Sequence, residues 1–127
     1  MNRQVIAGIG CRRDCPAETI VALLDRACAE AGCRATTLAA PAFKADEPGL
    51  RFAARQLGLT LVLIEAEALA AAQARCVTRS SRAFLATAFG SVAEGSALAA
   101  AGAGGRLILP RILGGGATCA LAEAIAS

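Results

Sequence analysis

The stretch from Gly8 to Glu18 combines two glycines, two cysteines, two arginines and two acidic residues in the sequence Gly-Ile-Gly-Cys-Arg-Arg-Asp-Cys-Pro-Ala-Glu. It follows the apolar run Val5–Ala7 and precedes an amphipathic pattern that begins at Pro16. This order predicts a strand, then a tight glycine turn, then the N-terminus of a helix.

The residue types in this turn are suited to anion binding. Gly8 and Gly10 have no side chain, so backbone N–H groups there would be free to approach a ligand, and the positive end of the helix dipole would face it. Arg12 and Arg13 add two full positive charges. The alternative is an ordinary turn between a strand and a helix, with both arginines in solvent.

A second charged stretch, Lys44–Leu50, has the sequence Lys-Ala-Asp-Glu-Pro-Gly-Leu. Its proline predicts the start of a helix that continues to Leu57, so the charged residues would lie in the loop before a helix. Lys44 would then contact an anion, and Asp46 or Glu47 would act as a polar ligand or general base. The alternative is that one of the two carboxylates only caps the helix.

Two further stretches are candidates for a ligand site. Ser91 and Glu94 form the Ser-x-x-Glu pattern of a capping box, in which Ser91 accepts the Glu94 N–H and Glu94 accepts the Ser91 N–H. This pattern alone explains both residues. Arg111 and the glycines at 114–116 follow the apolar run 107–109, and they predict an accessible loop that closes over a ligand or is disordered.

The alternation of apolar runs and amphipathic patterns predicts a single α/β domain over residues 1–127. Expected helices cover Pro16–Ala31, Pro48–Leu57, Glu65–Ala74 and Val92–Ala101, and expected strands cover Val5–Ala7, Ala35–Leu38, Leu61–Ile64 and Leu107–Leu109. Segment 117–122 is ambiguous between strand and helix, Cys76–Val77 is expected to be briefly extended, 78–82 to be a polar loop, and 84–89 to be a short helical turn.

The predicted architecture is a three-layer α/β/α sandwich with a mainly parallel or mixed sheet of about five strands. Ligands bind beyond the carboxyl ends of the strands in such folds, where the four stretches would converge on one basic pocket.

The composition excludes several classes of protein. With 127 residues, 3% aromatic residues and a net charge of +3, the chain lacks the dense basic face and the stacking aromatics of a nucleic-acid-binding protein. Mean hydropathy is +0.55, but the uncharged runs are far shorter than the roughly 20 residues of a membrane span. No signal-peptide pattern is present, and we expect a cytoplasmic protein.

The cysteines predict free thiols rather than a metal centre. The chain has six cysteines and no histidine, and no Cys-x-x-Cys pair occurs. Cys11 and Cys15, four positions apart, are the closest approach to a metal-binding or redox pair. We therefore expect no metal site and no cofactor, and thiols that stay reduced, several of them buried as small apolar groups.

Together the four stretches resemble the CobE/CbiG C-terminal domain family of cobalamin biosynthesis. The matching blocks, in family order, are Gly8–Arg13 with Ala17-Glu18, Lys44–Leu50, Ser91–Glu94 and the closing segment Gly114–Ala122. The resemblance implies an α/β/α domain that acts in corrin ring synthesis, and it favours a strand for the closing segment. CbiG-type proteins carry further domains and are associated with opening the ring-A lactone of a cobalt-precorrin and releasing acetaldehyde. A single domain is similar to the free-standing CobE type of the aerobic route.

The charge pattern and the resemblance lead to one main hypothesis and two alternatives. Corrin precursors carry acetate and propionate side chains, so we expect the chain to bind a precorrin or hydrogenobyrinic-acid-type tetrapyrrole intermediate. One alternative is a hydrolase-like enzyme in which Asp46, Glu47 or Glu94 is the catalytic acid or base, with a raised pKa. The other is a partner subunit of another corrin-pathway enzyme. The substrate-binding candidates are Gly8, Gly10, Cys11, Arg12, Arg13, Lys44, Asp46, Glu47, Ser91, Arg111, Gly114 and Gly115.

Overall fold

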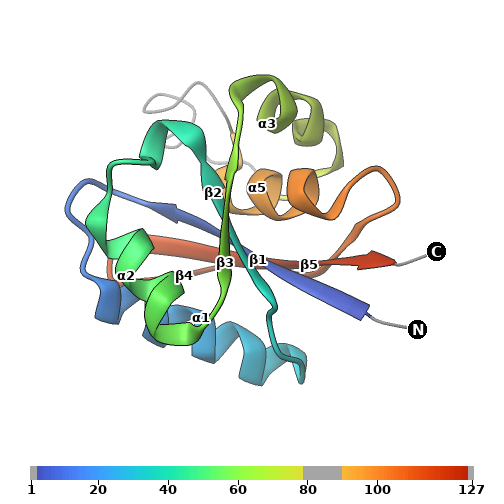
Figure 1. Cartoon of the computed structure of the whole chain (residues 1–127). Coiled ribbons are helices and arrows are strands. Elements are labelled where there is room, and N and C mark those ends of the chain that lie inside the picture. Colours follow the sequence, from blue (N-terminus) through green and yellow to red (C-terminus); the bar gives the residue numbers. More distant parts are fainter. Residues whose placement is uncertain (1–2, 79–89, 126–127) are drawn as a thin grey trace.

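The computed structural model describes residues 3–78 and 90–125, which form a mixed five-stranded sheet with helices on both faces (Figure 1). The strands are β1 (Arg3–Cys11), β2 (Thr37–Pro41), β3 (Thr60–Ile64), β4 (Arg106–Gly114) and β5 (Ala117–Ile125). The α-helices are α1 (Ala17–Ala31), α2 (Pro48–Leu57), α3 (Ala66–Ala72) and α5 (Val92–Ala101), and the 3₁₀ turns are η1 (Ala42–Lys44) and η2 (Gln73–Arg75). The predicted α/β/α sandwich with a mixed sheet is confirmed.

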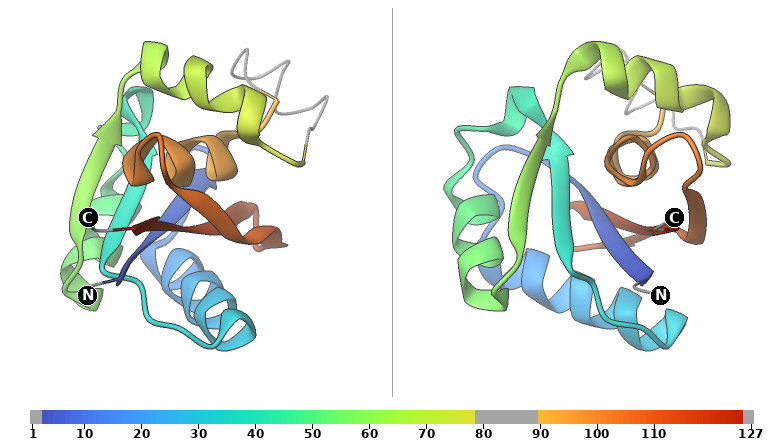
Figure 2. Two further views of the ribbon diagram at one scale, coloured as in Figure 1. Left: turned by 90° about the vertical axis from the view of Figure 1, so that its right-hand side faces the viewer. Right: turned by 45° about the vertical axis from the view of Figure 1, so that its right-hand side comes forward.

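The strand order β3-β2-β1-β5-β4 explains why each face of the sheet carries its own pair of helices. The β1–β2 and β2–β3 pairs are parallel, whereas β5 runs antiparallel to both β1 and β4. Right-handed crossovers through α1 and α2 step toward one edge of the sheet, so both helices cover the same face. The connection from β3 to β4 steps back across the sheet, which places α3 and α5 on the opposite face (Figure 2). β1, β2 and β4 therefore run in the same direction, and their carboxyl ends lie along one edge of the sheet, the edge formed by strand ends.

Strand β1 is longer than predicted and includes both glycines of the expected turn. Gly8 pairs with Ala39 of β2 and Ala120 of β5, and Gly10 pairs with Thr118 of β5. The prediction of a tight glycine turn at these two residues is therefore wrong. Gly8 is where α5 comes closest to the sheet, since a Cβ atom there would collide with the carbonyl oxygen of Ala93. Its lack of a side chain serves helix packing and not the approach of a ligand.

Helices α1 and α2 begin and end close to the predicted residues. Both end at glycines in the left-handed region, Gly32 with φ 68° and Gly58 with φ 70°. Pro48 is the first residue of α2, as expected. In α1, Pro16 is the N-cap residue, and no side-chain hydrogen bond caps the helix.

The predicted strands differ from the observed ones mainly in extent. β2 lies a few residues later than expected. β4 continues through Pro110. A proline is tolerated there because β4 is an edge strand and its pairing with β5 is irregular between Leu109 and Ile112. β5 confirms the strand expected for the closing segment. Cys76 has the extended backbone that was predicted, with φ −78° and ψ 143°, but Cys76–Val77 pairs with none of the described strands. The predicted polar loop beyond Thr78 and the predicted helical turn at 84–89 lie outside the described residues.

The core consists of two apolar layers, one on each face of the sheet. Small residues fill much of it, and Ala7, Ala39 and Ala120 in the central strands are 0% exposed. β3 is an edge strand, and three of its apolar side chains are only half-buried. Among the described helices, none combines the length and the apolar character needed to cross a membrane.

Candidate ligand-binding site

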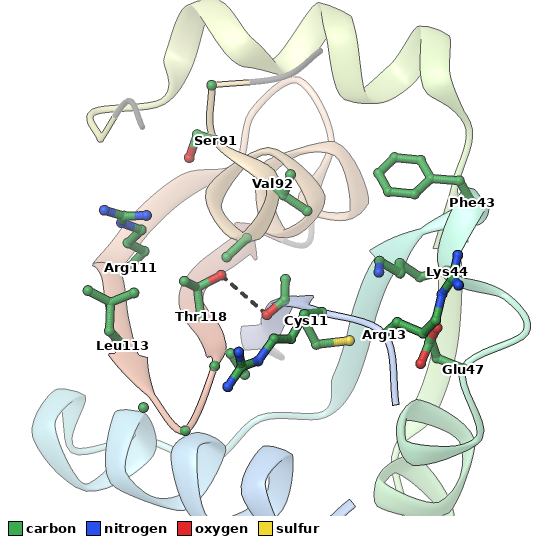
Figure 3. A pocket seen from close by; sticks show the side chains of 18 residues that line it. Cys11, Arg13, Phe43, Lys44, Glu47, Ser91, Val92, Arg111, Leu113 and Thr118 are labelled. Atoms are coloured by element: carbon green, nitrogen blue, oxygen red, sulfur yellow. Dashed lines mark hydrogen bonds between the residues drawn. The ribbon is translucent and has the colours of Figure 1, made fainter. Parts of the chain in front are cut away.

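A pocket of about 1090 Å³ opens at the edge where β1, β2 and β4 end (Figure 3). This is at the upper end of the roughly 300–1,000 Å³ of typical ligand pockets, so the space suits a large ligand. The start of α5 forms its upper side, and the β4–β5 hairpin and the loops after β1 and β2 form the rest. The lining residues are Gly10, Cys11, Arg12, Arg13, Phe43, Lys44, Glu47, Gly90, Ser91, Val92, Ala93, Arg111, Leu113, Gly114, Gly115, Gly116, Ala117 and Thr118.

Most of the residues proposed from the sequence meet in this pocket. The predicted candidates among its lining are Gly10, Cys11, Arg12, Arg13, Lys44, Glu47, Ser91, Arg111, Gly114 and Gly115. Three candidates lie elsewhere: Gly8 is buried under α5, Asp46 is exposed outside the lining, and Glu94 is buried behind it. The four stretches converge because three of them lie at or just after the carboxyl ends of β1, β2 and β4, and the fourth begins α5 above them.

The apolar part of the lining was not predicted from the sequence. Phe43 is 50% exposed and Leu113 is 60% exposed, and they lie on opposite sides of the pocket, with Val92 between them on α5 (Figure 3). Because both side chains border the same pocket, they give it an apolar surface that a ligand could cover. The signal available in the sequence was position alone, since Phe43 immediately precedes Lys44 and Leu113 immediately precedes the glycine turn.

The pocket is electropositive. Arg12, Arg13, Lys44 and Arg111 line it together with one carboxylate, Glu47. The helix that directs its N-terminus at this space is α5, and no described residue from the start of α1 belongs to the lining. The expectation that the first helix supplies its dipole is thus wrong, and the equivalent contribution comes from α5.

Glu47 joins the two loops that carry three of these cations. The backbone N–H of Asp14 donates a hydrogen bond of 2.8 Å to Glu47 Oε1. Asp14 has a φ of 63°, in the left-handed region that aspartate adopts more readily than most residues with a side chain. At Gly49 a Cβ atom would collide with the carbonyl oxygen of Cys15, so the start of α2 is pressed against the loop after β1. These contacts hold the loop after β1 against the loop after β2 and the start of α2.

The glycines at 114–116 form a tight β-hairpin. Gly115 and Gly116 have φ values of 61° and 88°, which match the two-residue turn that glycine favours. Arg26 of α1 donates a hydrogen bond of 2.7 Å to the carbonyl oxygen of Leu113 and so ties the hairpin to the helix. A Cβ atom on Gly116 would lie 2.7 Å from Arg12 Nη2, so the bare backbone leaves room for the Arg12 guanidinium.

The capping box predicted for Ser91 and Glu94 is not formed. The Ser91 N–H donates to Gln73 Oε1 at 3.0 Å, and the Ser91 hydroxyl donates to Glu94 Oε1 at 3.3 Å. Burial by itself raises the pKa of the Glu94 carboxyl, but the Thr78 and Arg111 N–H groups, the Thr78 hydroxyl and the Val77 N–H together hold this pKa below its usual value. Glu94 therefore lacks the raised pKa that the enzyme hypothesis requires.

Cys11 is the thiol that lines the pocket, and it is held in its protonated form. Burial, then the nearby Cys15, raise the pKa of Cys11 from 9.0 to about 11; Lys44 opposes this shift and Glu47 adds to it. Among the described residues no disulfide is present, and no group of three or more His, Cys, Asp or Glu side chains is arranged to hold a metal ion.

We expect Cys11 to react slowly with iodoacetamide at neutral pH, roughly a hundredfold more slowly than an unperturbed thiol, because only the thiolate is nucleophilic. Peptide mass spectrometry after timed alkylation measures the rate, and the same protein unfolded in urea provides the control. Alkylation of folded and unfolded protein at equal rates would contradict the buried, protonated thiol.

Comparison with known proteins assigns the domain to a family. Residues 5–122 match the family model described as Cobalamin synthesis G C-terminus. The chain belongs to this family. Protein CobE from Sinorhizobium sp. is 36% identical to it over 121 residues, which cover 93% of the chain and 79% of that protein. The resemblance drawn from the four stretches is confirmed.

Solved structures of proteins described as cobalamin biosynthesis proteins share its fold. A crystal structure of CobE, a protein from the cobalamin (vitamin B12) biosynthetic pathway, has a TM-score of 0.91 and 36% identity, covering 100% of this chain and 94% of that one. The cobalamin biosynthesis protein chiG from Agrobacterium tumefaciens str. C58 has a TM-score of 0.78 and 35% identity, covering 96% and 99%. A cobalamin biosynthesis protein G homolog from Sulfolobus solfataricus has the same fold at 22% identity and a TM-score of 0.76; the chain covers 38% of that longer protein.

Proposed function

We propose that the chain binds a carboxylate-rich tetrapyrrole intermediate of corrin synthesis, a precorrin or a compound of the hydrogenobyrinic acid type, in the pocket beside α5. The observation that carries this proposal is the combination of four cationic side chains with exposed apolar ones around one large space. A corrin precursor has the matching chemistry, because its broad ring is apolar and its peripheral acetate and propionate groups are negatively charged.

The arrangement of charged and apolar side chains around the pocket fits such a ligand. Arg111 lies on the β4 side of the pocket and Lys44 on the β2 side (Figure 3), so carboxylates on opposite edges of a ring would each meet a cation. Phe43, Val92 and Leu113 offer apolar surface for the ring itself. Gly115 and Gly116 are exposed and leave the backbone accessible between these groups.

A binding role is also supported by the acid–base groups at the site. Glu94 is ionised and fully hydrogen-bonded behind the lining, and Cys11 is held as a thiol. Glu47 is the remaining carboxylate of the lining, and its Oε1 atom already accepts the Asp14 N–H. The pocket is thus better equipped to hold an anion than to move a proton or attack a carbonyl group.

A visible-absorption titration with hydrogenobyrinic acid and earlier precorrins tests the proposal. The wild-type protein should give a saturable spectral shift that weakens with added salt. Replacing both pocket arginines, Arg12→Ala/Arg13→Ala, should raise the Kd about tenfold, since two exposed charge-assisted contacts are lost. The matched control Arg34→Ala/Arg55→Ala removes two exposed charges at the opposite edge of the sheet and should leave the Kd unchanged.

Two results would contradict the proposal. Absence of a saturable shift with all of these corrinoids would exclude the binding role. Equal weakening by the pocket pair and the control pair would show that affinity follows net charge and not this pocket.

A further inference from the structure

Glu94 is a buried carboxylate that joins three separate parts of the chain. Its side chain is 0% exposed. Oε1 accepts the backbone N–H groups of Val77 and Thr78, each at 2.9 Å, and Oε2 accepts the backbone N–H of Arg111 at 3.1 Å. The Ser91 hydroxyl, at 3.3 Å from Oε1, and the Thr78 hydroxyl add to these backbone donors. A charge is tolerated at such depth only when donors of this kind surround it, so carboxylate and donors fix one another.

Two of these donors belong to residues that line the pocket. Ser91 and Arg111 lie on the same side of it (Figure 3). Gln73 holds Ser91 from the other direction, because its Nε2 donates to the Ser91 carbonyl oxygen at 2.9 Å and its Oε1 accepts the Ser91 N–H. The start of α5 is therefore clamped between Gln73 and its own Glu94.

Arg111 needs this support because it lies in the irregular part of β4. The pairing with β5 shifts register between Leu109 and Ile112, so Arg111 is outside the regular ladder. Irregularities of this kind turn a side chain to a new direction while leaving backbone groups without their ladder partners. Here the displaced N–H of Arg111 finds the Glu94 carboxylate.

We propose that Glu94 is a positioning residue for the ligand: its carboxylate holds the irregular backbone at Arg111 and the Ser91 hydroxyl, so that the Arg111 guanidinium faces the bound anion. This inference rests on the proposed function, and it assigns the buried carboxylate a role through Arg111 and not through proton transfer. The alternative for such a residue is a purely structural one, in which its loss lowers stability and leaves the affinity of folded protein unchanged.

A double-mutant cycle separates the two roles. Glu94→Gln keeps the shape but replaces one acceptor oxygen by an NH₂ group, which faces N–H donors unfavourably. We expect this variant to raise the Kd for hydrogenobyrinic acid about tenfold in the wild-type background. In Arg111→Ala it should add nothing, whereas in Arg13→Ala it should add its full effect, because contacting groups couple and separated ones do not. All variants are measured at a temperature where circular dichroism shows them fully folded.

A ligand-free measurement separates failure of this inference from failure of the proposed function. In ¹H–¹⁵N spectra, Glu94→Gln should shift the amide signal of Arg111 and speed its hydrogen exchange, while the amide of Arg13 stays unchanged. An unchanged Arg111 amide, or equal Kd changes in the Arg111→Ala and Arg13→Ala backgrounds, would overturn the positioning role. A wild-type protein that binds no corrinoid overturns the proposed function and with it the role toward a ligand, whatever the spectra show.

Discussion

Replacing Gly8 by alanine should lower the free energy of unfolding by about 3 kcal/mol or more, the upper range for overpacking a core. The added Cβ atom would collide with the carbonyl oxygen of Ala93 and would lie 2.6 Å from the backbone nitrogen of Ala97. Both atoms belong to the backbone of α5, which cannot turn aside as the end of a flexible side chain can. Helix α5 would have to move away from β1, and urea unfolding followed by circular dichroism measures the cost.

Gly104→Ala is the matched control, since nothing lies within 4 Å of a Cβ atom at that position. Its effect should stay within about 0.5 kcal/mol, as for surface substitutions in general. The packing role would be contradicted if Gly8→Ala unfolded at the same urea concentration as the wild type but no longer bound the corrinoid. That result would restore the interpretation in which the Gly8 N–H contacts the ligand.

The sequence could not distinguish these two roles for Gly8. A glycine after a short apolar run fits both a turn and a point of close helix packing, and the helix that decides the question, α5, comes much later in the chain. The order of strands and helices was predictable, because each element carries its own periodicity and start or stop residues. What each glycine is for depends on contacts across the sheet.

The same limit explains which parts of the pocket were predictable. Charged residues that follow strands were expected to converge, because parallel strands end at one edge, and Arg12, Lys44 and Arg111 do so. Glu94 was assigned by a local rule to its neighbour Ser91, yet its partners Val77 and Arg111 come from other segments. A rule based on sequence spacing considers only residues a few positions apart, so it cannot identify hydrogen-bond donors from distant segments.

Removing the Glu94 side chain should destabilise the folded protein strongly at neutral pH. In Glu94→Ala the N–H groups of Val77, Thr78 and Arg111 lose their acceptor in a partly buried setting. At about 1 kcal/mol or more for each orphaned donor, the loss is on the order of 3 kcal/mol. Thermal unfolding should show a Tm lower by roughly 10 °C. A Tm within a degree or two of the wild-type value would contradict this role for the carboxylate.

The same carboxylate should make the wild-type protein sensitive to acid. In the unfolded chain the Glu94 carboxyl titrates near 4.5, and in the folded protein its hydrogen bonds hold the pKa lower despite burial. Between these two pKa values the unfolded state binds more protons than the folded state, so stability rises with pH through this window. The contribution is fully present above pH 4.5 and is lost as the pH falls through the folded pKa.

The Tm of the wild type should therefore fall more steeply with decreasing pH in this range than the Tm of Glu94→Gln. The exposed control Glu30→Gln should follow the wild type, and equal pH dependence in wild type and Glu94→Gln would show that other carboxylates govern acid unfolding.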